Sequence, residues 1–274
     1  MNFQILWNTR NVSLSKISFR GRNFFLYFLG VFFVSPAGGG ELPQTIDQIK
    51  PSIVGIGTFQ KTRSPALKFI GTGFAVSDGS LVVTNAHVLP EVIDNNKMES
   101  LVVIVSGKGK EPELRSTVQV ALDKEHDVAL LKISGETLPA MKLGDSGTVR
   151  EGQMFAFTGF PIGMILGFHP VTHRGMISSI NPVVLPALNS KQLDVKIIAQ
   201  IKKSAYPVFQ IDGTAYPGNS GSPLYDPETG IVHGVINMVF VKGMKESALS
   251  DPSGISYAIP INHVRDLLQE KQTR

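Results

Sequence analysis

The chain has 274 residues, of which 42% are hydrophobic and none is a cysteine. That hydrophobic share supports a sizeable core and argues against disorder, and the lack of cysteine excludes a disulfide scaffold, a thiol nucleophile and a cysteine-ligated zinc site. Residues 1–37 hold four of the 26 basic residues and none of the 22 acidic ones, so the remainder is close to neutral and lacks the basic excess expected of a nucleic-acid-binding protein.

Residues 1–37 have the pattern of an export signal. Basic residues precede an uninterrupted apolar run of 11 residues, Phe24–Val34. A signal-peptide core has ~7–15 such residues, whereas a membrane-spanning helix needs ~20. The small residues Ser35 and Ala37 predict cleavage after Ala37, a periplasmic or extracellular location, and membrane contact only in transit. An uncleaved anchor is the alternative, because the basic leader is long.

From residue 51 onward, short β-branched runs are separated by Gly, Pro, Asp and Asn, which predicts strands and turns. So many short strands favour barrels or a sandwich. A polar stretch between Ser134 and Glu151 divides them into two halves, each about the size of a six-stranded barrel. The expected strands are Ser52–Thr58, Gly73–Val76, Leu81–Thr84, Leu101–Ser106, Thr117–Leu122, Val128–Ile133, Met154–Thr158, Gly175–Ile180, Val208–Ile211, Val232–Met238 and Ile255–Ala258.

Apolar residues near the C-terminus repeat with a helical period of 3.6 residues, and polar residues lie between them. The pattern predicts one closing amphipathic helix. We therefore expect an all-β chain of two six-stranded antiparallel barrels with a C-terminal helix. The predicted organisation is a signal peptide (1–37), an N-terminal segment (38–50), the first barrel (51–138), a linker (139–150), and the second barrel with the helix (151–274).

Ser220 is the candidate nucleophile. It lies in the run Pro-Gly-Asn-Ser-Gly-Ser-Pro, after one expected strand and before another. Glycines on both sides let the backbone approach a substrate carbonyl closely, and we expect the N–H groups of Gly218 and Ser220 to form an oxyanion hole. The same motif by itself also fits an ordinary turn.

Acyl transfer further needs a base and a group that orients the base. His87 follows an apolar strand, and Asp127 stands at the head of a hydrophobic strand. Each residue alone fits a structural role. With Ser220 they form a predicted catalytic triad, for which Asp123 and Asp145 are the rival carboxylates.

Together these segments resemble the chymotrypsin-fold serine peptidases, and within them the Deg/HtrA proteases. The order histidine, aspartate, serine is that of this fold. The resemblance implies a trypsin-like endopeptidase domain acting on unfolded or exported polypeptides, without the PDZ domain that Deg/HtrA proteins commonly carry. It covers residues 45–270, and its further segments are 49–54, 71–74, 143–146, 160–163, 175–178 and 254–260.

The nucleophile motif departs from the Deg/HtrA pattern. Ser222 stands where those proteins usually have a glycine, and Gly-Asn-Ser-Gly-Ser-Pro is instead similar to the glutamyl endopeptidases. Those enzymes place a specificity histidine where this chain has Ile236, which disfavours a glutamate-reading pocket.

The resemblance also implies a substrate pocket. Thr214 would form its floor, and Val235, Ile236 and Asn237 one wall. A largely apolar pocket without a carboxylate predicts small or medium apolar residues before the scissile bond. Asp212 would enter the pocket if the alignment were shifted.

No His-Glu-x-x-His pair and no Gly-Lys-Ser/Thr loop occurs, so we expect no metal, no nucleotide and no other cofactor. Polypeptides are the expected partners, and the oligomeric state stays open. Two other functions remain possible on the same fold: a peptide-binding protein without turnover, and an esterase or acyl transferase that uses the same triad. The five remaining histidines are predicted to be structural: His126, His169, His173, His233 and His263.

Overall fold

The computed structural model describes residues 42–106, 112–161, 167–182, 206–237 and 254–273. The expected signal peptide and its cleavage site lie outside these residues. Within the described ranges, no helix has the length and apolar character needed to cross a membrane.

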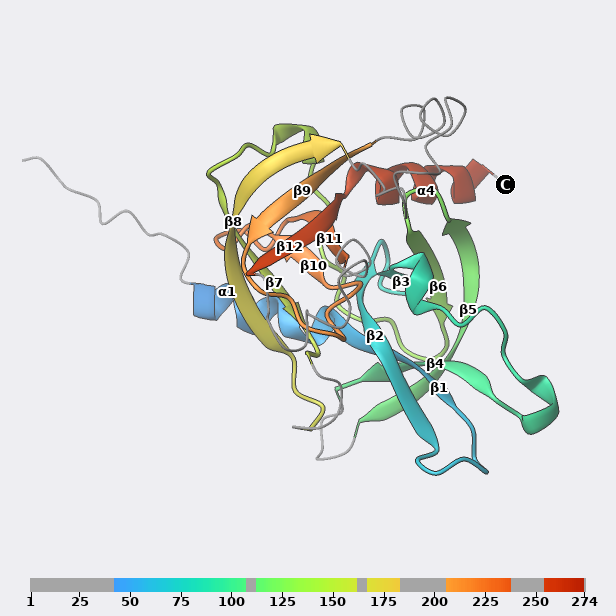
Figure 1. The fold of residues 1–274 in the computed structure, drawn as a ribbon. Coiled ribbons are helices and arrows are strands. Elements are labelled where there is room, and N and C mark those ends of the chain that lie inside the picture. The colour runs from blue at the N-terminus through green and yellow to red at the C-terminus, as the bar shows by residue number, and fades with distance from the viewer. Residues whose placement is uncertain (1–41, 107–111, 162–166, 183–205, 238–253, 274) are drawn as a thin grey trace, which may run out of the picture. The chain divides into compact units, whose positions relative to one another are not determined.

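The first barrel is formed by the strands that precede residue 134. It closes in the order β1-β2-β3-β6-β5-β4, and every pairing is antiparallel (Figure 1). Its strands are β1 (Ile53–Phe59), β2 (Leu67–Val76), β3 (Leu81–Thr84), β4 (Ser100–Val105), β5 (Glu113–Asp123) and β6 (Val128–Ile133).

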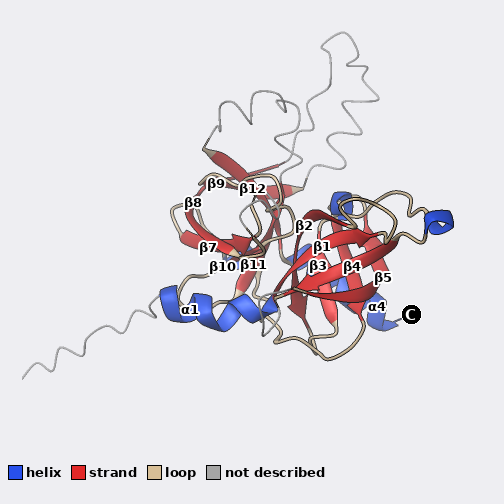
Figure 2. Cartoon of the chain, turned by 90° about the horizontal axis from the view of Figure 1, so that it is seen from below, coloured by secondary structure: helices blue, strands red, loops and turns tan. Residues whose placement is uncertain are grey.

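The second barrel closes in the order β10-β11-β12-β9-β8-β7, again with antiparallel pairings only (Figure 2). Its strands are β7 (Met154–Gly159), β8 (Val171–Pro182), β9 (Pro207–Asp212), β10 (Pro223–Tyr225), β11 (Val232–Asn237) and β12 (Ile255–Pro260). The predicted fold class, two six-stranded antiparallel barrels of the chymotrypsin type with a C-terminal helix, is thereby confirmed.

The apolar runs of the first barrel are buried on both faces, because each face packs against a different core. Val82 of β3 belongs to a cluster built from the first barrel, whereas its neighbour Val83 belongs to a cluster that also contains Phe160, Tyr225 and Val235 of the second half. Successive side chains of a strand point to opposite faces, so one strand serves both cores. The shared cluster joins the two barrels.

The structure differs from the expectation at the ends of several strands, of which β2, β5 and β8 are longer than predicted, and in elements that were not predicted. A helix, α1 (Leu42–Ile49), and a 3₁₀ turn, Lys50–Ser52, precede β1, which therefore begins at Ile53 and not at Ser52. Pro51 fixes φ at about −65°, which suits a 3₁₀ turn, so the turn includes Ser52 and the strand begins after it. The strand β10 was not expected, because it has three residues and begins with a proline.

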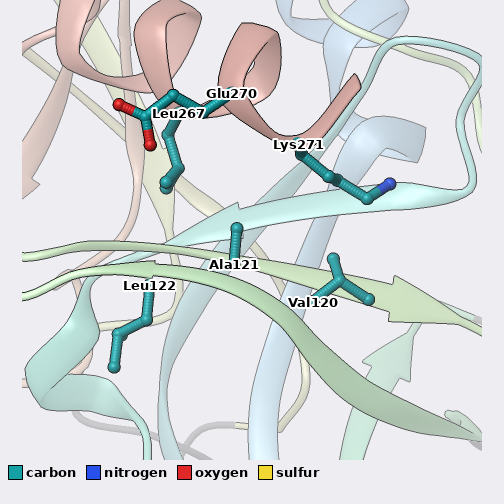
Figure 3. A pocket seen from close by; sticks show the side chains of 6 residues that line it. All are labelled: Val120, Ala121, Leu122, Leu267, Glu270 and Lys271. Atoms are coloured by element: carbon teal, nitrogen blue, oxygen red, sulfur yellow. The ribbon is translucent and has the colours of Figure 1, made fainter. Parts of the chain in front are cut away.

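The predicted C-terminal helix is present as α4 (Asn262–Thr273), with Val264 and Leu267 buried. It packs against β5 and β6. Figure 3 shows a small pocket at this contact, with Leu267 and Glu270 on the helix above Ala121 and Leu122. The pocket measures about 140 Å³, room for only a few water molecules. Its lining residues are Val120, Ala121, Leu122, Leu267, Glu270 and Lys271.

Candidate active site

The pairing of β3 with β6 brings His87 and Asp127 together. These strands are antiparallel, with Thr84 opposite Ala129, so the end of β3 lies beside the start of β6. His87 lies in a 3₁₀ turn that follows β3, and Asp127 immediately precedes β6. Two residues distant in sequence therefore become neighbours through strand register alone.

Asp127, His87 and Ser220 form a continuous hydrogen-bonded series. Nδ1 of His87 lies 2.6 Å from Oδ2 of Asp127, and Nε2 lies 3.0 Å from Oγ of Ser220. A carboxylate only accepts, so the neutral imidazole donates through Nδ1 and is left with Nε2 as an acceptor for the serine hydroxyl. The backbone N–H of His87 donates to Oδ1 of Asp127 at 2.8 Å, which fixes the carboxylate against the turn.

Ser220 lies in the loop between β9 and β10, where glycines take backbone conformations that other residues avoid. Gly218 has φ +102° and Gly221 has φ +88°. These left-handed dihedrals fold the loop tightly around the serine. Among the described residues, the backbone N–H groups of Gly218 and Ser220 have no hydrogen-bond acceptor, so both are available to a bound group.

Asp127 has hydrogen-bond partners in addition to His87. Nδ2 of Asn237 donates to its Oδ2 at 2.7 Å, and Nδ2 of Asn85 donates to its backbone oxygen at 3.1 Å. The N–H of Ala86 donates to the same backbone oxygen at 3.1 Å. Asp127 has φ +54°, a left-handed conformation that aspartate tolerates better than most residues. These contacts stabilise the carboxylate in one orientation.

The two rival carboxylates have other partners. Asp123 accepts from the ring of His126 at 2.6 Å, and Asp145 accepts from the side chain of Asn262 at 2.9 Å. Burial opposes ionisation of Asp123, but hydrogen bonds from His126 outweigh it and leave the pKa of this carboxyl below its usual value. Neither carboxylate contacts His87.

The residues expected to form a substrate pocket are not all free to do so. Thr214 is half-buried. Val235 and Ile236 are fully buried and belong to two different core clusters. Asn237 is also fully buried, and its side-chain amide is directed at Asp127. Asp212, at the end of β9, is exposed.

Three polar residues have contacts with the site that the sequence does not predict. Asn237 is expected in a pocket wall, Thr72 is only part of the segment 71–74, and Asn85 has no predicted role. Their contacts with the site join residues 42 to 146 positions apart, and only the position of Asn85, two residues before His87, hinted at its role. In the described part of the chain, no cluster of three or more histidines and carboxylates is arranged to hold a metal ion.

The sequence is similar to those of known peptidases. The family model of the trypsin-like peptidase domain matches residues 71–235. A probable periplasmic serine endoprotease, DegP-like, of Halomonas elongata is 33% identical over 242 residues, which cover 85% of this chain and 42% of that protein. A DegP-like protein of Pseudomonas putida is 30% identical over 214 residues, covering 76% of this chain and 37% of that protein.

A third relative is the serine protease HTRA4 of Mus musculus, which is 28% identical over 237 residues, covering 84% of this chain and 40% of that protein. The chain spans less than half the length of each of these curated relatives. The resemblance to Deg/HtrA proteases is confirmed by these matches. The two barrels, the hydrogen-bonded serine and the family match lead to one conclusion: this chain belongs to the trypsin-like peptidase domain family.

Proposed function

We propose that the chain is a serine endopeptidase that hydrolyses peptide bonds through an acyl-enzyme, with His87, Asp127 and Ser220 as its catalytic triad. The observation that carries the proposal is the hydrogen-bonded series from Asp127 through His87 to Oγ of Ser220, next to two unoccupied backbone donors. Nucleophile, base, orienting carboxylate and oxyanion donors are the four parts that acyl transfer from a peptide requires.

In the first half of the proposed reaction, Oγ of Ser220 attacks the scissile carbonyl carbon while its proton passes to Nε2 of His87, 3.0 Å away. Asp127 holds the ring in the tautomer that leaves Nε2 free and stabilises the imidazolium that forms. The carbonyl oxygen becomes an oxyanion, which accepts from the N–H groups of Gly218 and Ser220. The C–N bond then breaks, and His87 gives its proton to the leaving amine.

In the second half, water replaces the amine. His87 removes a proton from the water molecule while the oxygen of that water attacks the acyl carbon. The same two N–H groups again donate hydrogen bonds to the oxyanion that forms. The bond to Oγ breaks, and the proton returns from Nε2 to the serine. The enzyme is regenerated without any cofactor.

We further propose that the protein acts on unfolded or exported polypeptides in the periplasm or outside the cell. Two observations support this location: the basic residues and apolar run within residues 1–37, and relatives named periplasmic serine endoproteases. A preference for small or medium apolar residues before the scissile bond is proposed because Thr214, and not a carboxylate, occupies the expected floor of the pocket.

The test combines covalent labelling with turnover. A fluorophosphonate probe should form an adduct on Ser220, located by mass spectrometry, and casein should be cleaved. Ser220→Ala should abolish labelling and lower turnover by on the order of 10⁶. Ser178→Ala, which removes an exposed hydroxyl from β8, serves as the matched control and should change neither.

Two outcomes would overturn the proposal in different ways. A folded protein that takes no label on Ser220 would be a peptide-binding protein without turnover. A labelled protein that hydrolyses short esters but not casein would be an esterase. Cleavage-site profiling on a denatured proteome would test the apolar preference directly.

A further inference from the structure

Thr72, a fully buried residue of β2, contacts the nucleophile loop of the other barrel through both its backbone and its side chain. Its N–H donates to the carbonyl oxygen of Ser220 at 2.9 Å. Its Oγ1 donates to the carbonyl oxygen of Gly218 at 2.7 Å and accepts from the N–H of Phe160 at 3.1 Å. One residue of the first barrel thus holds two carbonyl groups of the loop that carries the serine.

These contacts fall on alternate peptide units of the loop. In the unit that joins Gly218 to Asn219, the oxygen is held by Thr72 and the N–H donates to the oxygen of Tyr216 at 2.9 Å. In the unit that joins Ser220 to Gly221, the oxygen is again held by Thr72 and the N–H donates to the oxygen of Ile236 at 2.9 Å. Both units are therefore fixed at both ends.

The peptide units directly before each of these two fixed units carry the donors that the chemistry needs. The N–H groups of Gly218 and Ser220 belong to the units that precede these two fixed ones, and neither N–H has an acceptor among the described residues. A free N–H keeps its direction only if its neighbouring units cannot rotate. The orientation of both donors therefore depends on the two carbonyl contacts made by Thr72.

The hydroxyl of Thr72 has no freedom to exchange its partners. It has one proton, and because a carbonyl oxygen can only accept, that proton goes to Gly218. Its oxygen accepts from Phe160, so its donor and one acceptor position are both engaged. The surroundings of the hydroxyl are tight, because a Cβ atom added to Gly159 would lie 2.9 Å from Oγ1 of Thr72. A side chain of the same shape without the hydroxyl would deprive the buried N–H of Phe160 and the partly buried carbonyl oxygen of Gly218 of this partner.

We infer that Thr72 is a positioning residue for the oxyanion hole: its hydroxyl aligns the N–H groups of Gly218 and Ser220 from the opposite barrel. The inference rests on the proposed peptidase function. An oxyanion exists only after attack, so a misaligned donor should reduce transition-state stabilisation and leave ground-state binding of the peptide unchanged.

The kinetic test compares three substitutions. Thr72→Val keeps the side-chain shape and removes the hydroxyl, so kcat on a peptide substrate should fall by ~10²–10³, the loss typical of one oxyanion donor, while KM stays within a factor of about three. Thr72→Ser keeps the hydroxyl and should retain kcat within about tenfold. Thr117→Val is the matched control. The hydroxyl of Thr117 also donates to a backbone oxygen, that of Lys132 at 2.8 Å, but this hydrogen bond lies within the first barrel and does not involve the nucleophile loop.

Several results would overturn the inference. Thr72→Val with kcat within about threefold of the unmodified protein would do so, and so would an equal loss in Thr117→Val. A folded Thr72→Ser that lost as much kcat as Thr72→Val would show that the methyl group matters and not the hydroxyl. If Thr72→Val fails to fold, Thr72→Ala replaces it with the same expected split between kcat and KM.

A readout that does not need turnover separates this inference from the proposed function. The amide NMR signals of Gly218 and Ser220 should shift in Thr72→Val and stay close to the unmodified positions in Thr72→Ser. If the unmodified protein neither takes the fluorophosphonate label nor cleaves casein, the proposed function fails, and these signals still decide whether Thr72 aligns the loop. Unshifted signals in Thr72→Val would refute the alignment in either case.

Discussion

The side-chain amide of Asn237 donates a 2.7 Å hydrogen bond to Oδ2 of Asp127, although the two residues are 110 positions apart and lie in different barrels. The same carboxylate accepts from the ring and from the backbone N–H of His87. Its orientation is therefore set from both barrels at once.

Removing this amide should weaken the reaction without unfolding the protein. A hydrogen bond to a charged group contributes about 1.5–3 kcal/mol, so Asn237→Ala should lower kcat/KM by roughly 10–100-fold. Steady-state kinetics on a peptide substrate measure the loss, with thermal unfolding as a check on folding. Asn181→Ala, on the exposed end of β8, is the control. An Asn237→Ala variant with kinetics equal to those of the control would mean that Asp127 is oriented by the first barrel alone.

The choice of carboxylate can be tested by comparing two aspartates. Asp127→Asn should reduce kcat by ~10⁴, because an amide in this position favours the wrong tautomer of His87. Asp123→Asn should change kcat little, because Asp123 contacts His126 and not His87. The opposite pattern, with activity lost only in Asp123→Asn, would show that the third member of the triad has been misassigned.

Alanine substitutions at two glycines with the same φ distinguish the cost of backbone strain from the cost of steric overlap. Gly152 and Gly221 both have φ +88°, but an added Cβ atom meets nothing within 4 Å at Gly152, whereas at Gly221 it overlaps the oxygen of Thr72 and lies 2.5 Å from Oγ1 of Thr84. Gly152→Ala should lower the free energy of unfolding by about 1–2 kcal/mol, the cost of the left-handed conformation, and leave activity intact.

Gly221→Ala should cost more than this strain and abolish turnover, since the loop must move to admit the methyl group. Urea denaturation and casein cleavage measure the two effects. Equal losses of stability in Gly152→Ala and Gly221→Ala would show that the nucleophile loop has room to adjust.

Stability should fall in mild acid, partly because of His263. Burial lowers the pKa of this histidine, and the electrostatic effect of His126, whose ring stacks on it at a centroid distance of 3.8 Å, lowers it further. The nearby carboxylates of Asp123, Asp266 and Glu125 oppose both effects. The unfolded chain takes up this proton near pH 6.5, before the folded chain does. Above that pH, His263 is uncharged in both states and does not change the free energy of unfolding. As the pH falls from the unfolded pKa toward the lower folded pKa, protonation of the unfolded chain lowers this free energy.

His263→Phe keeps an aromatic ring against His126 and removes the proton site. The free energy of unfolding, measured by urea denaturation between about pH 7.5 and 5.5, should depend less steeply on pH in this variant. Burial also lowers the pKa of His173, so the double variant with His173→Phe should have a still shallower dependence. An unchanged slope in His263→Phe would show that this side chain does not contribute to acid sensitivity.

Some elements could be predicted closely from local pattern. The strands β3 and β6 have the expected bounds, because each is a run of mostly apolar, mostly buried residues between turns. The strand β10 and the helix α1 could not be predicted in this way. The first has only three residues. The second has only eight residues, too few for a long periodic pattern, and two of its apolar residues, Leu42 and Ile49, pack against the shared core.

The same limit applies to the site. His87, Asp127 and Ser220 carry recognisable motifs, and the structure brings these three predicted residues within hydrogen-bonding distance. The roles of Thr72 and Asn237 depend on how one barrel packs against the other, since their partners are 146 and 110 positions away. No local pattern encodes a contact of that separation.

The 133 positions between His87 and Ser220 have a consequence during synthesis. Domains fold as units, beginning with the part that the ribosome releases first. A chain released as far as β6 already contains the base and its carboxylate, but it has neither the hydroxyl nor Asn237. Under the proposed function, a partly synthesised chain therefore has no peptidase activity toward itself or toward neighbouring proteins before the second barrel has been made.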